Sequence, residues 1–567
     1  MYLRKTVKKV NGRVYEYWLI VEGYRDKDGK VKQRIIRRLG KLTNEEVAKW
    51  RAILSINSLK ETVITRMDDI KIKSVREGTS VLILDSLWKY LGLKDLISSL
   101  VNEKTQKITE ALVINRCVHP NSDYKVSSWY KKTVLPFIQS EEAISATEIY
   151  RTLDRILEIE KETQVHLYKK IKQIKLDKFD LSFYDLTSTY FEGKGPPIAV
   201  FGHSRDGKNN KKQIILGMAT TKNGFPFWWK IFEGNTVDSL TLIEAITALK
   251  EQFKLKECVL VIDKGIVTNK NLDLLEREGY FFISTIKRSR IRKLPQFPEE
   301  FFRTINENNL SEKLTYFNYY NKRAYYKELG RVSNRRYILC FNPEKFIEER
   351  RNREEKLSSI EKYFDNLNKE LKNAKYNRNK EKLQNRIYYY LKKRGSLRFF
   401  KVKVTEEGIE YRRNISAIKR EELLDGVYVL CTNLMSKTPQ DLIKAYQNRI
   451  KIECAFHHIK SFVEVRPIYH RLSNRVRSHV FVCVLAYLLN LIFEHFVREK
   501  IEDLTIQRIY EELEKEDACE IEIKNVGIRK IKLKEPSPLV QKILKILSSR
   551  GIMDENFLIN LRCVSGN

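Results

Sequence analysis

The sequence predicts an α/β protein. Three observations predict it: strand-like alternation in successive segments, one short apolar run typical of a strand buried on both faces, and helical periodicity before and between them. A chain of 567 residues is long enough for about four domains or subdomains. Its 107 Lys and Arg against 73 Asp and Glu leave a formal net charge of +34. That surplus disfavours a free-standing metabolic enzyme and favours a polyanionic partner, either nucleic acid or an anionic membrane surface.

The N-terminal residues are predicted to form a basic β module. Residues 14–21 alternate like a strand, residues 26–29 form a turn, and residues 31–39 return as a second strand rich in Arg. Residues 1–50 carry 14 basic and 6 acidic side chains, which fits either a solvated hairpin face or a contact with the DNA backbone. Residues 78–175 show helical periodicity, most of which describes a core, and a helical DNA-binding subdomain is compatible with it.

The next segment carries most of the fold prediction. Three antiparallel strands, a helix, a buried strand, a second helix and a last strand are expected in turn, at residues 181–187, 212–220, 226–232, 239–253, 258–262, 269–278 and 280–285. Asn223-Gly224 supplies the hairpin turn between the second and third strands. This order of elements is that of a ribonuclease-H-like fold.

Residues 300–435 are predicted to interrupt this core as a β-plus-helical insertion. A long polar helical stretch over residues 343–393 is expected to fold as a projecting helical hairpin, because its heptad-like apolar positions are sparse. Residues 341–400 hold 17 basic and 9 acidic side chains. Short strands are expected around the hairpin, at residues 315–319, 336–341, 398–404 and 427–432.

Membrane insertion and zinc binding are both disfavoured. The longest apolar stretch, Val480 to Phe493, has 14 residues, fewer than the roughly 18–20 of a membrane span, and reads as a buried core helix. The N-terminus shows no apolar signal region, so a cytoplasmic location is expected. The eight Cys form no Cys-x-x-Cys pair and resemble small buried hydrophobes in a reducing compartment. His470 and His479 have no zinc-like spacing.

One short pattern carries the strongest chemical signal. Tyr446, Arg449, Glu453 and Lys460 are separated by 3, 4 and 7 residues. At 3.6 residues per turn these intervals place all four on one face of a helix. By spacing alone, the pattern equally describes a ladder of ion pairs on a solvated helix.

The pattern Y-x2-R-x3-E-x6-K resembles the signature of the insertion-sequence-four superfamily of DDE transposases. Three upstream blocks resemble the same group in order: Tyr184–Thr187, Phe232–Asp238 and Val261–Gly265, the last with Lys264 where Arg is more usual. The similarity covers residues 1 to about 500.

This resemblance implies that Asp185, Asp263 and Glu453 are the catalytic and metal-binding acids. Asp185 lies in the first predicted strand and Asp263 ends the buried strand, and these strands are neighbours in such a fold. Phosphodiester cleavage needs an activated attacking oxygen and a neutralised leaving oxygen, and two Mg²⁺ ions about 3.5–4 Å apart supply both. Carboxylates suit Mg²⁺, and Mn²⁺ is expected to substitute. Tyr446, Arg449 and Lys460 would bind transposon-end phosphates, although the cations could instead only neutralise the acids.

Other acidic and aromatic residues receive weaker assignments. Asp263 could cap the following helix but lies several residues early, Asp238 is a better helix N-cap, and Asp206 is expected to be solvated. A metal-binding role for His457 and His458 is not favoured, and His203 is left unassigned. All six Trp lie outside residues 300–435, so a DNA-hairpin route that uses a Trp of the insertion is in doubt, although Tyr or Phe could offer a stacking surface.

The predicted organisation has six parts, which are 1–75 (basic β module and linker), 76–175 (helical, DNA-end binding), 176–299 (core with both Asp), 300–435 (insertion), 436–500 (core with Glu453) and 501–567 (helical tail). The predicted function is a prokaryotic, nucleoid-associated DNA transposase. It would bind terminal inverted repeats of double-stranded DNA, cleave the ends, and join 3′-OH ends to target DNA as a homodimer. A stand-alone nuclease or resolvase of the same fold, and an inactive domesticated DNA-binding protein, remain as alternatives.

Overall fold

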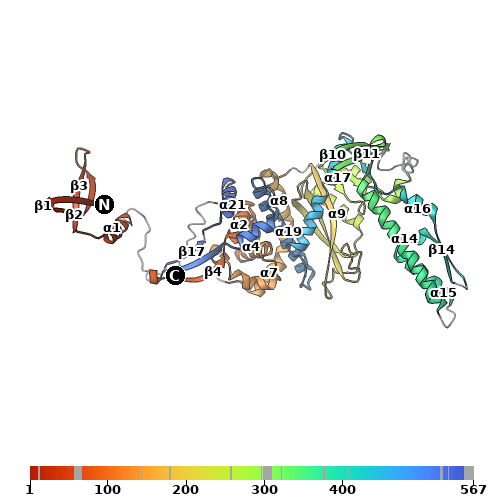
Figure 1. Ribbon diagram of the computed structural model, residues 1–567, viewed down its shortest axis with the longest axis horizontal. Helices are drawn as coiled ribbons and strands as arrows, with labels where there is room; N and C mark the ends of the chain where they lie inside the picture. The colour runs from red at the N-terminus through yellow and green to blue at the C-terminus, as the bar shows by residue number, and fades with distance from the viewer. Residues whose placement is uncertain are drawn as a thin grey trace. The chain divides into compact units, whose positions relative to one another are not determined.

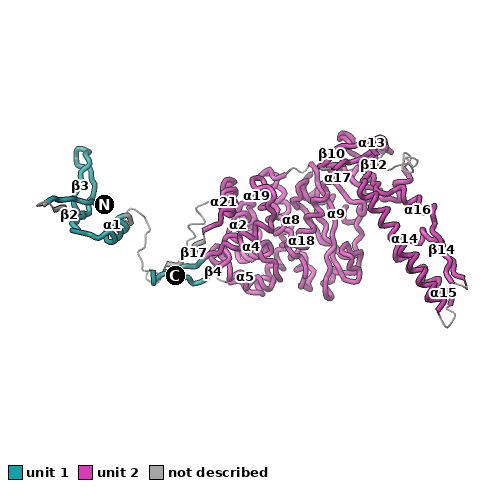
Figure 2. Tube along the Cα trace, in the orientation of Figure 1, with its two compact units in different colours: residues 1–74, 519–531, 565–567 teal, residues 75–518, 532–564 magenta. Residues whose placement is uncertain are grey.

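The computed structural model describes the chain except for residues 11–12, 57–66, 142, 178–179, 256–257, 295–296, 298–309, 321, 374–378, 406–407, 524–527, 534 and 554–567. It divides into two compact units (Figure 2). Unit 1 comprises residues 1–74, 519–531 and 565–567, and unit 2 comprises residues 75–518 and 532–564.

Unit 1 contains one small antiparallel sheet and most of a second three-stranded sheet. The first joins β1 (Tyr2–Val10), β2 (Arg13–Arg25) and β3 (Val31–Gly40) in sequence order and is followed by α1 (Asn44–Ile56). The hairpin of β2 and β3 agrees with the sequence prediction, whereas β1 was not predicted because its apolar residues do not alternate.

The second sheet of unit 1 has the order β17-β16-β4. Its strands are β4 (Ile70–Glu77), β16 (Asp517–Ile523) and β17 (Ile528–Leu533). The expectation that residues 501–567 form a purely helical tail is therefore wrong. In β16, Cys519, Ile521 and Ile523 alternate with Ala518, Glu520 and Glu522, which is the period of a strand rather than of a helix.

Helices gather around α19 (Ser473–Arg498) at one end of unit 2 (Figure 1). This helix packs against α4 and α7, and 83% of its most apolar window is buried inside the structure. It is long and apolar enough to cross a membrane, but its burial is that of a core helix, as predicted. The other helices of this layer are α2 (Thr79–Tyr90), α3 (Leu93–Leu100), α4 (Glu103–Val118), α5 (Val126–Tyr130), α6 (Leu135–Ile138), α7 (Ala146–Arg155), α8 (Glu160–Gln173), α20 (Ile506–Leu513) and α21 (Pro538–Ser549).

A nine-stranded mixed sheet forms the centre of unit 2, with the order β10-β11-β12-β15-β9-β8-β5-β6-β7. Five of its strands are β5 (Leu181–Tyr190), β6 (Gln213–Thr221), β7 (Pro226–Glu233), β8 (Val259–Ile262) and β9 (Phe281–Thr285). β5, β6 and β7 are antiparallel, while β8 pairs parallel to β5 and β9 parallel to β8. α9 (Asp238–Glu251) and α10 (Asn269–Arg277) connect them. The order of strands and helices is the one that the sequence predicts.

The sheet continues into the segment that was expected to be an insertion. β15 (Val427–Thr432) pairs antiparallel to β9, and β12 (Arg335–Phe341), β11 (Lys322–Val332) and β10 (Thr315–Tyr319) follow outward. Four of the described strands in residues 300–435, β10, β11, β12 and β15, therefore extend the central sheet. β11 was not predicted, because its Lys, Arg and Glu side chains mask the strand pattern.

The rest of that segment is an arm with a core of its own. α14 (Pro343–Lys372) and α15 (Lys380–Lys393) lie side by side and pack on β13 (Phe400–Val404) and β14 (Ile409–Arg413). Tyr363 and Tyr390 stack between the two helices with ring centroids 3.7 Å apart. Figure 1 shows α14 leading away from the sheet, so the predicted helical hairpin is present, with a β-hairpin added.

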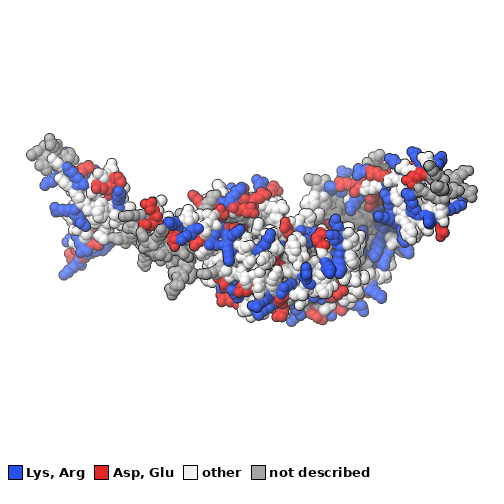
Figure 3. Space-filling model, turned by 90° about the horizontal axis from the view of Figure 1, so that it is seen from below, with Lys and Arg blue, Asp and Glu red and all other residues white. Residues whose placement is uncertain are grey.

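Surface charge and cysteine burial follow the sequence analysis closely. Lys and Arg side chains are spread over the face that Figure 3 shows, with Asp and Glu among them, rather than gathered in one patch. Cys454 is exposed and Cys519 half-buried, while the other described cysteines are buried and all described ones are free. Cys563 lies outside the described residues.

Candidate active site

Asp185 and Asp263 lie on neighbouring parallel strands of the central sheet. Tyr184 of β5 pairs with Ile262 of β8, so the next residue on each strand is an aspartate at the same level of the sheet. Asp263 is the first residue after β8, and its Oδ2 accepts a hydrogen bond from the Gly265 amide at 3.3 Å. The structure thus brings together two of the three acids that the sequence analysis selected.

The third predicted acid, Glu453, reaches this pair through an arginine. Arg449 donates from Nη1 to Asp263 Oδ1, and its Nη2 lies 2.7 Å from Glu453 Oε1. The side chain of Glu453, on α18 (Ile450–Ser461), is 49% exposed. One guanidinium therefore holds carboxylates from β8 and α18 together, 190 residues apart in sequence.

Tyr446 supports that guanidinium from a different helix. It lies near the end of α17 (Pro439–Gln447), and Arg449 stands 5.3 Å from the centroid of its ring. Its hydroxyl is 3.1 Å from Thr285 Oγ1 at the end of β9, and burial raises its pKa. The prediction that the four signature residues share one face of one helix is wrong. α17 ends at Gln447 and α18 begins at Ile450, so Arg449 lies in the break between them.

Lys460 lies away from the three acids. Two turns beyond Glu453 on α18, its Nζ is 2.7 Å from Asp206 Oδ1, and Arg466 Nη1 is 3.0 Å from Asp206 Oδ2. Burial is the main cause that lowers the pKa of Lys460. Asp206 is accordingly paired with two cations, not solvated as the sequence analysis expected, because the loop that carries it folds back onto α18.

A further acid, Asp238, lies beside the site and was expected only as a helix N-cap. Asp238 begins α9 but does not cap it, since Val237 occupies the N-cap position without a side-chain bond. Its Oδ2 instead accepts from Arg205 Nη2 at 2.7 Å. A Cβ built on Gly265 would lie 3.5 Å from Asp238 Oδ2 and 3.6 Å from Asp263 Oδ2, so both carboxylates border this glycine. The Gly234-Asn turn just before α9 was the only sequence signal for this contact.

The remaining predicted neighbours of the site are structural or peripheral. His458 packs its ring against Phe462 and Tyr487, and burial lowers its pKa to about 4. His457 is exposed and bonds within its own helix to Ser461. His203 is exposed in the loop after β5.

The electrostatics of Asp185 fit a site for a divalent cation. Burial raises the pKa of Asp185 to about 6, and the negative charge of Asp263 also raises it. A hydrogen bond from the Leu186 amide and the positive charges of Arg449 and Arg205 lower the same pKa. A bound cation stabilises a carboxylate that burial and like charge disfavour. Together with Asp263 and Glu453, which already share the positive charge of Arg449, Asp185 gives the hard oxygen donors that Mg²⁺ and Mn²⁺ prefer.

A cleft of about 410 Å³ opens beside these acids. Its lining includes Asp263, Glu453, Tyr446 and Arg449. It also includes Arg288, which is ion-paired with Glu349, and Lys345 in the first turn of α14. A cleft lined by both carboxylates and cations is suited to a phosphate chain that is held near bound metal.

Comparison with known proteins identifies the class. Residues 184–489 match the family model of the transposase DDE domain, and residues 3–62 match that of the IS1634 family transposase, N-terminal domain. No curated protein matches. Among solved structures, a piggyBac transposase synaptic complex with hairpin DNA matches with a TM-score of 0.36 at 10% identity, covering 88% of each chain. A pre-cleavage Mos1 transpososome matches with a TM-score of 0.14 at 12% identity, covering 43% of this chain and 68% of that one.

The DDE match spans more than half of the 567 residues, and the chain therefore belongs to the transposase DDE domain family. It is a DDE transposase, an enzyme of DNA transposition whose class depends on divalent metal ions.

Proposed function

We propose that Asp185, Asp263 and Glu453 are the catalytic triad of this transposase and its ligands for two Mg²⁺ ions. The observation that carries the proposal is that Arg449 bridges Asp263 and Glu453, while Asp185 lies beside Asp263 on the neighbouring parallel strand. The core topology supports it, because an order of three antiparallel strands followed by two parallel ones is that of a ribonuclease-H-like fold. The Tyr446–Lys460 signature supports membership of the insertion-sequence-four superfamily.

The acids and Arg449 are proposed to have different roles in the reaction. Bound Mg²⁺ supplies Lewis acidity at the scissile phosphate. Asp185 and Asp263 hold their oxygens at one level of the rigid sheet, and Glu453 approaches from α18. Arg449 neutralises Asp263 and Glu453, which would hold the metal ions, and its guanidinium could also bind a DNA phosphate.

The basic residues around the triad are proposed to hold the transposon end. Tyr446 orients the Arg449 guanidinium, and Arg449 binds the phosphate beside the scissile bond. Lys460 reaches the DNA only after leaving Asp206, to which it is paired in the free protein. Residues 1–75 and 76–175 and the arm would bind flanking DNA, and two chains would pair two ends in a synaptic dimer.

The reaction proposed is end cleavage that frees 3′-OH groups, followed by their joining to target DNA. The protein would act in the prokaryotic cytoplasm, at the nucleoid. A stand-alone nuclease of the same fold would cut without joining. A domesticated, inactive DNA-binding derivative is disfavoured, because Asp185, Asp263 and Glu453 are all intact in the sequence.

Joining is the step that separates the proposal from a nuclease. Purified protein is incubated with pre-cleaved transposon ends, a supercoiled target plasmid and Mg²⁺. The proposal predicts covalent end-to-plasmid products that depend on Asp263, so that Asp263→Asn abolishes them and Asp95→Asn, an exposed aspartate on α3, does not. Cleavage of uncut ends without any joined product would identify a nuclease.

A further inference from the structure

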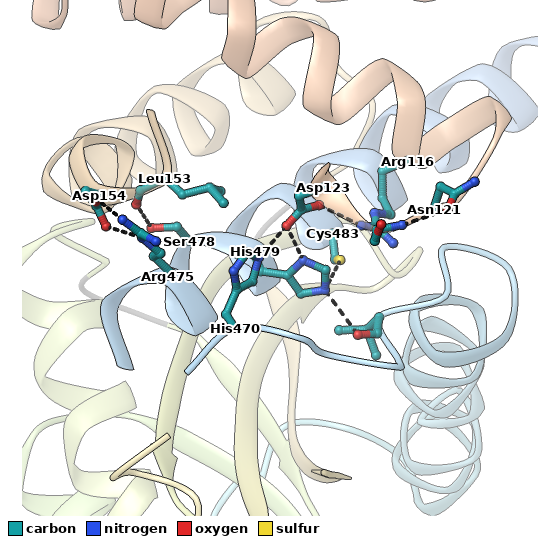
Figure 4. A network of polar contacts seen from close by, with 12 residues as sticks. Arg116, Asn121, Asp123, Leu153, Asp154, His470, Arg475, Ser478, His479 and Cys483 are labelled. Atoms are coloured by element: carbon teal, nitrogen blue, oxygen red, sulfur yellow. Dashed lines mark hydrogen bonds and ion pairs between the residues drawn. The ribbon is translucent and has the colours of Figure 1, made fainter. Parts of the chain in front are cut away.

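A second cluster of metal-ligating side chains lies apart from the active site. Among the residues that the structure describes, Asp123, His470 and His479 form the one trio of His, Cys, Asp or Glu whose ligand atoms all lie within 4.8 Å of one another. Asp123 Oδ2 is 2.7 Å from His470 Nε2 and 2.9 Å from His479 Nδ1. Figure 4 shows both imidazole rings directed at this one carboxylate.

The three residues come from distant parts of the chain. Asp123 begins a short 3-10 turn, η2 (Asp123–Lys125), after α4. His470 lies in the segment between α18 and α19, and His479 in the second turn of α19. The two histidines are 347 and 356 residues from the aspartate, so no local motif signals the cluster.

The two most buried residues of the cluster, Asp123 and His479, are each oriented by a further contact. Arg116 Nη2 donates to the other oxygen of Asp123, Oδ1, at 2.8 Å. The second ring nitrogen of His479, Nε2, is 3.1 Å from the carbonyl oxygen of Val465. Metal-bound histidines characteristically donate their second N–H to a carbonyl or carboxylate, which fixes the ring and the tautomer. These contacts leave Asp123 Oδ2 and His479 Nδ1 facing each other, 2.9 Å apart.

Burial closes the cluster on most sides. The side chains of Asp123 and His479 are 3% and 4% exposed, and that of His470 is 9% exposed. Cys483 Sγ lies 3.7 Å from His479 Nε2, at the ring edge away from Asp123, so it is not placed as a ligand. An ion would enter past His470 and complete its coordination with water.

We propose that Asp123, His470 and His479 bind one divalent transition-metal ion, with Zn²⁺ the best match. Two imidazole nitrogens and one carboxylate oxygen are a common protein ligand set for Zn²⁺. The same donors suit Mg²⁺ poorly, because Mg²⁺ prefers oxygen ligands alone. The site is therefore chemically distinct from the three-carboxylate active site.

The position of the ion indicates a structural role. It would tie the end of α4 to the segment that follows α18 and to the start of α19. Arg116 also donates from Nη1 to the carbonyl oxygen of Glu464, at 3.2 Å, in that same segment. Because α18 carries Glu453, the ion would help to hold the catalytic helix against the helical layer.

The test uses the full-length, tag-free protein, stripped with a chelator, reloaded with Zn²⁺ and desalted. Metal per chain is then measured by mass spectrometry. We expect about one Zn²⁺ per chain in the wild type, in an Asp185→Asn/Asp263→Asn variant and in His457→Gln, a histidine control outside the cluster. We expect loss of that ion in His470→Gln, whose side chain is the most exposed of the three and least needed for folding.

A second readout keeps the proposal open to refutation if a variant folds poorly. Co²⁺ added to the stripped wild type should give the visible absorption of a nitrogen- and oxygen-ligated ion, and Zn²⁺ should raise its melting temperature by several degrees. Neither effect should occur in His470→Gln that keeps the wild-type circular dichroism. A wild type that retains no Zn²⁺ and melts unchanged would overturn the proposal. It would show that Asp123 is satisfied by its contacts with Arg116, His470 and His479, without an ion.

Discussion

At the scale of single residues, Arg449 is the centre of the free active site. It takes two carboxylates that would otherwise repel each other and rests on the face of Tyr446. A planar guanidinium can bridge two acids, whereas an ammonium acts as one point charge. The arginine is therefore expected to hold the site in shape before metal and DNA arrive.

Arg449→Lys is expected to lower end cleavage by about 10- to 100-fold, the equivalent of one lost charge-assisted hydrogen bond of about 1.5–3 kcal/mol. Initial cleavage rates over a Mg²⁺ titration provide the measurement. Arg277→Lys, on α10, is the matched control. Wild-type rates in Arg449→Lys would show that the bridge has no catalytic role.

A second residue-scale feature is a pair of buried acids in the helical layer. Glu110 Oε2 accepts from Gln106 and Gln139 at 3.0 and 3.1 Å. Burial raises the pKa of Glu110, and the neighbouring Asp85 raises it further. The folded protein therefore keeps a proton on Glu110 that the unfolded chain releases above about pH 4.3, and this contribution to stability falls as the pH rises above that value.

Glu110→Gln should remove this pH dependence, because an amide accepts from both glutamines and donates permanently toward Asp85. We expect the variant and the wild type to melt at similar temperatures at pH 5 and the variant to be several degrees more stable at pH 8. Thermal melts at both pH values measure this, with Glu103→Gln, exposed on the same helix, as control. An equal difference at both pH values would contradict the assignment of the proton to Glu110.

At the scale of elements, the sequence predicted what local pattern encodes. The alternation of residues 181–187 and the apolar run at 258–262 specified two neighbouring strands, and hence the placement of Asp185 and Asp263. The break between α17 and α18 was not predictable, because no Gly or Pro marks residues 448–449 and tertiary contacts of Arg449 determine it. The pairing of β15 with β9, and of Asp206 with Lys460, likewise depends on contacts between distant segments.

The arm is an element whose removal can be tested. Asn342 N and Gly426 O are 2.8 Å apart at its base, and Arg413 donates to Glu354 at 2.8 Å, so a short Gly-Ser linker can replace residues 355–412. That segment carries 16 basic and 8 acidic residues and has a separate core. We expect the shortened protein to fold and to bind transposon-end DNA more weakly, with a shallower salt dependence. An unchanged salt slope would exclude the arm from the DNA contact.

At the scale of the whole molecule, the net charge of +34 gives a quantitative expectation. Its cations are dispersed over the surface (Figure 3), so binding should engage many phosphates at once. The logarithm of the DNA association constant should fall linearly with the logarithm of the salt concentration, with a slope of about −0.9 for each phosphate contacted. Fluorescence anisotropy at several salt concentrations measures this slope. A slope near zero would contradict binding that depends on contacts between basic side chains and DNA phosphates.

The central claim is that Asp185, Asp263 and Glu453 together form the catalytic site. The most direct measurement is Mg²⁺-dependent cleavage of a labelled transposon end by Asp185→Asn, Asp263→Asn and Glu453→Gln, each first shown to bind that DNA. Glu251→Gln, an exposed glutamate at the end of α9, serves as the matched control. The account predicts loss of cleavage in all three variants with binding retained. Wild-type cleavage by any one of them would remove that residue from the catalytic site.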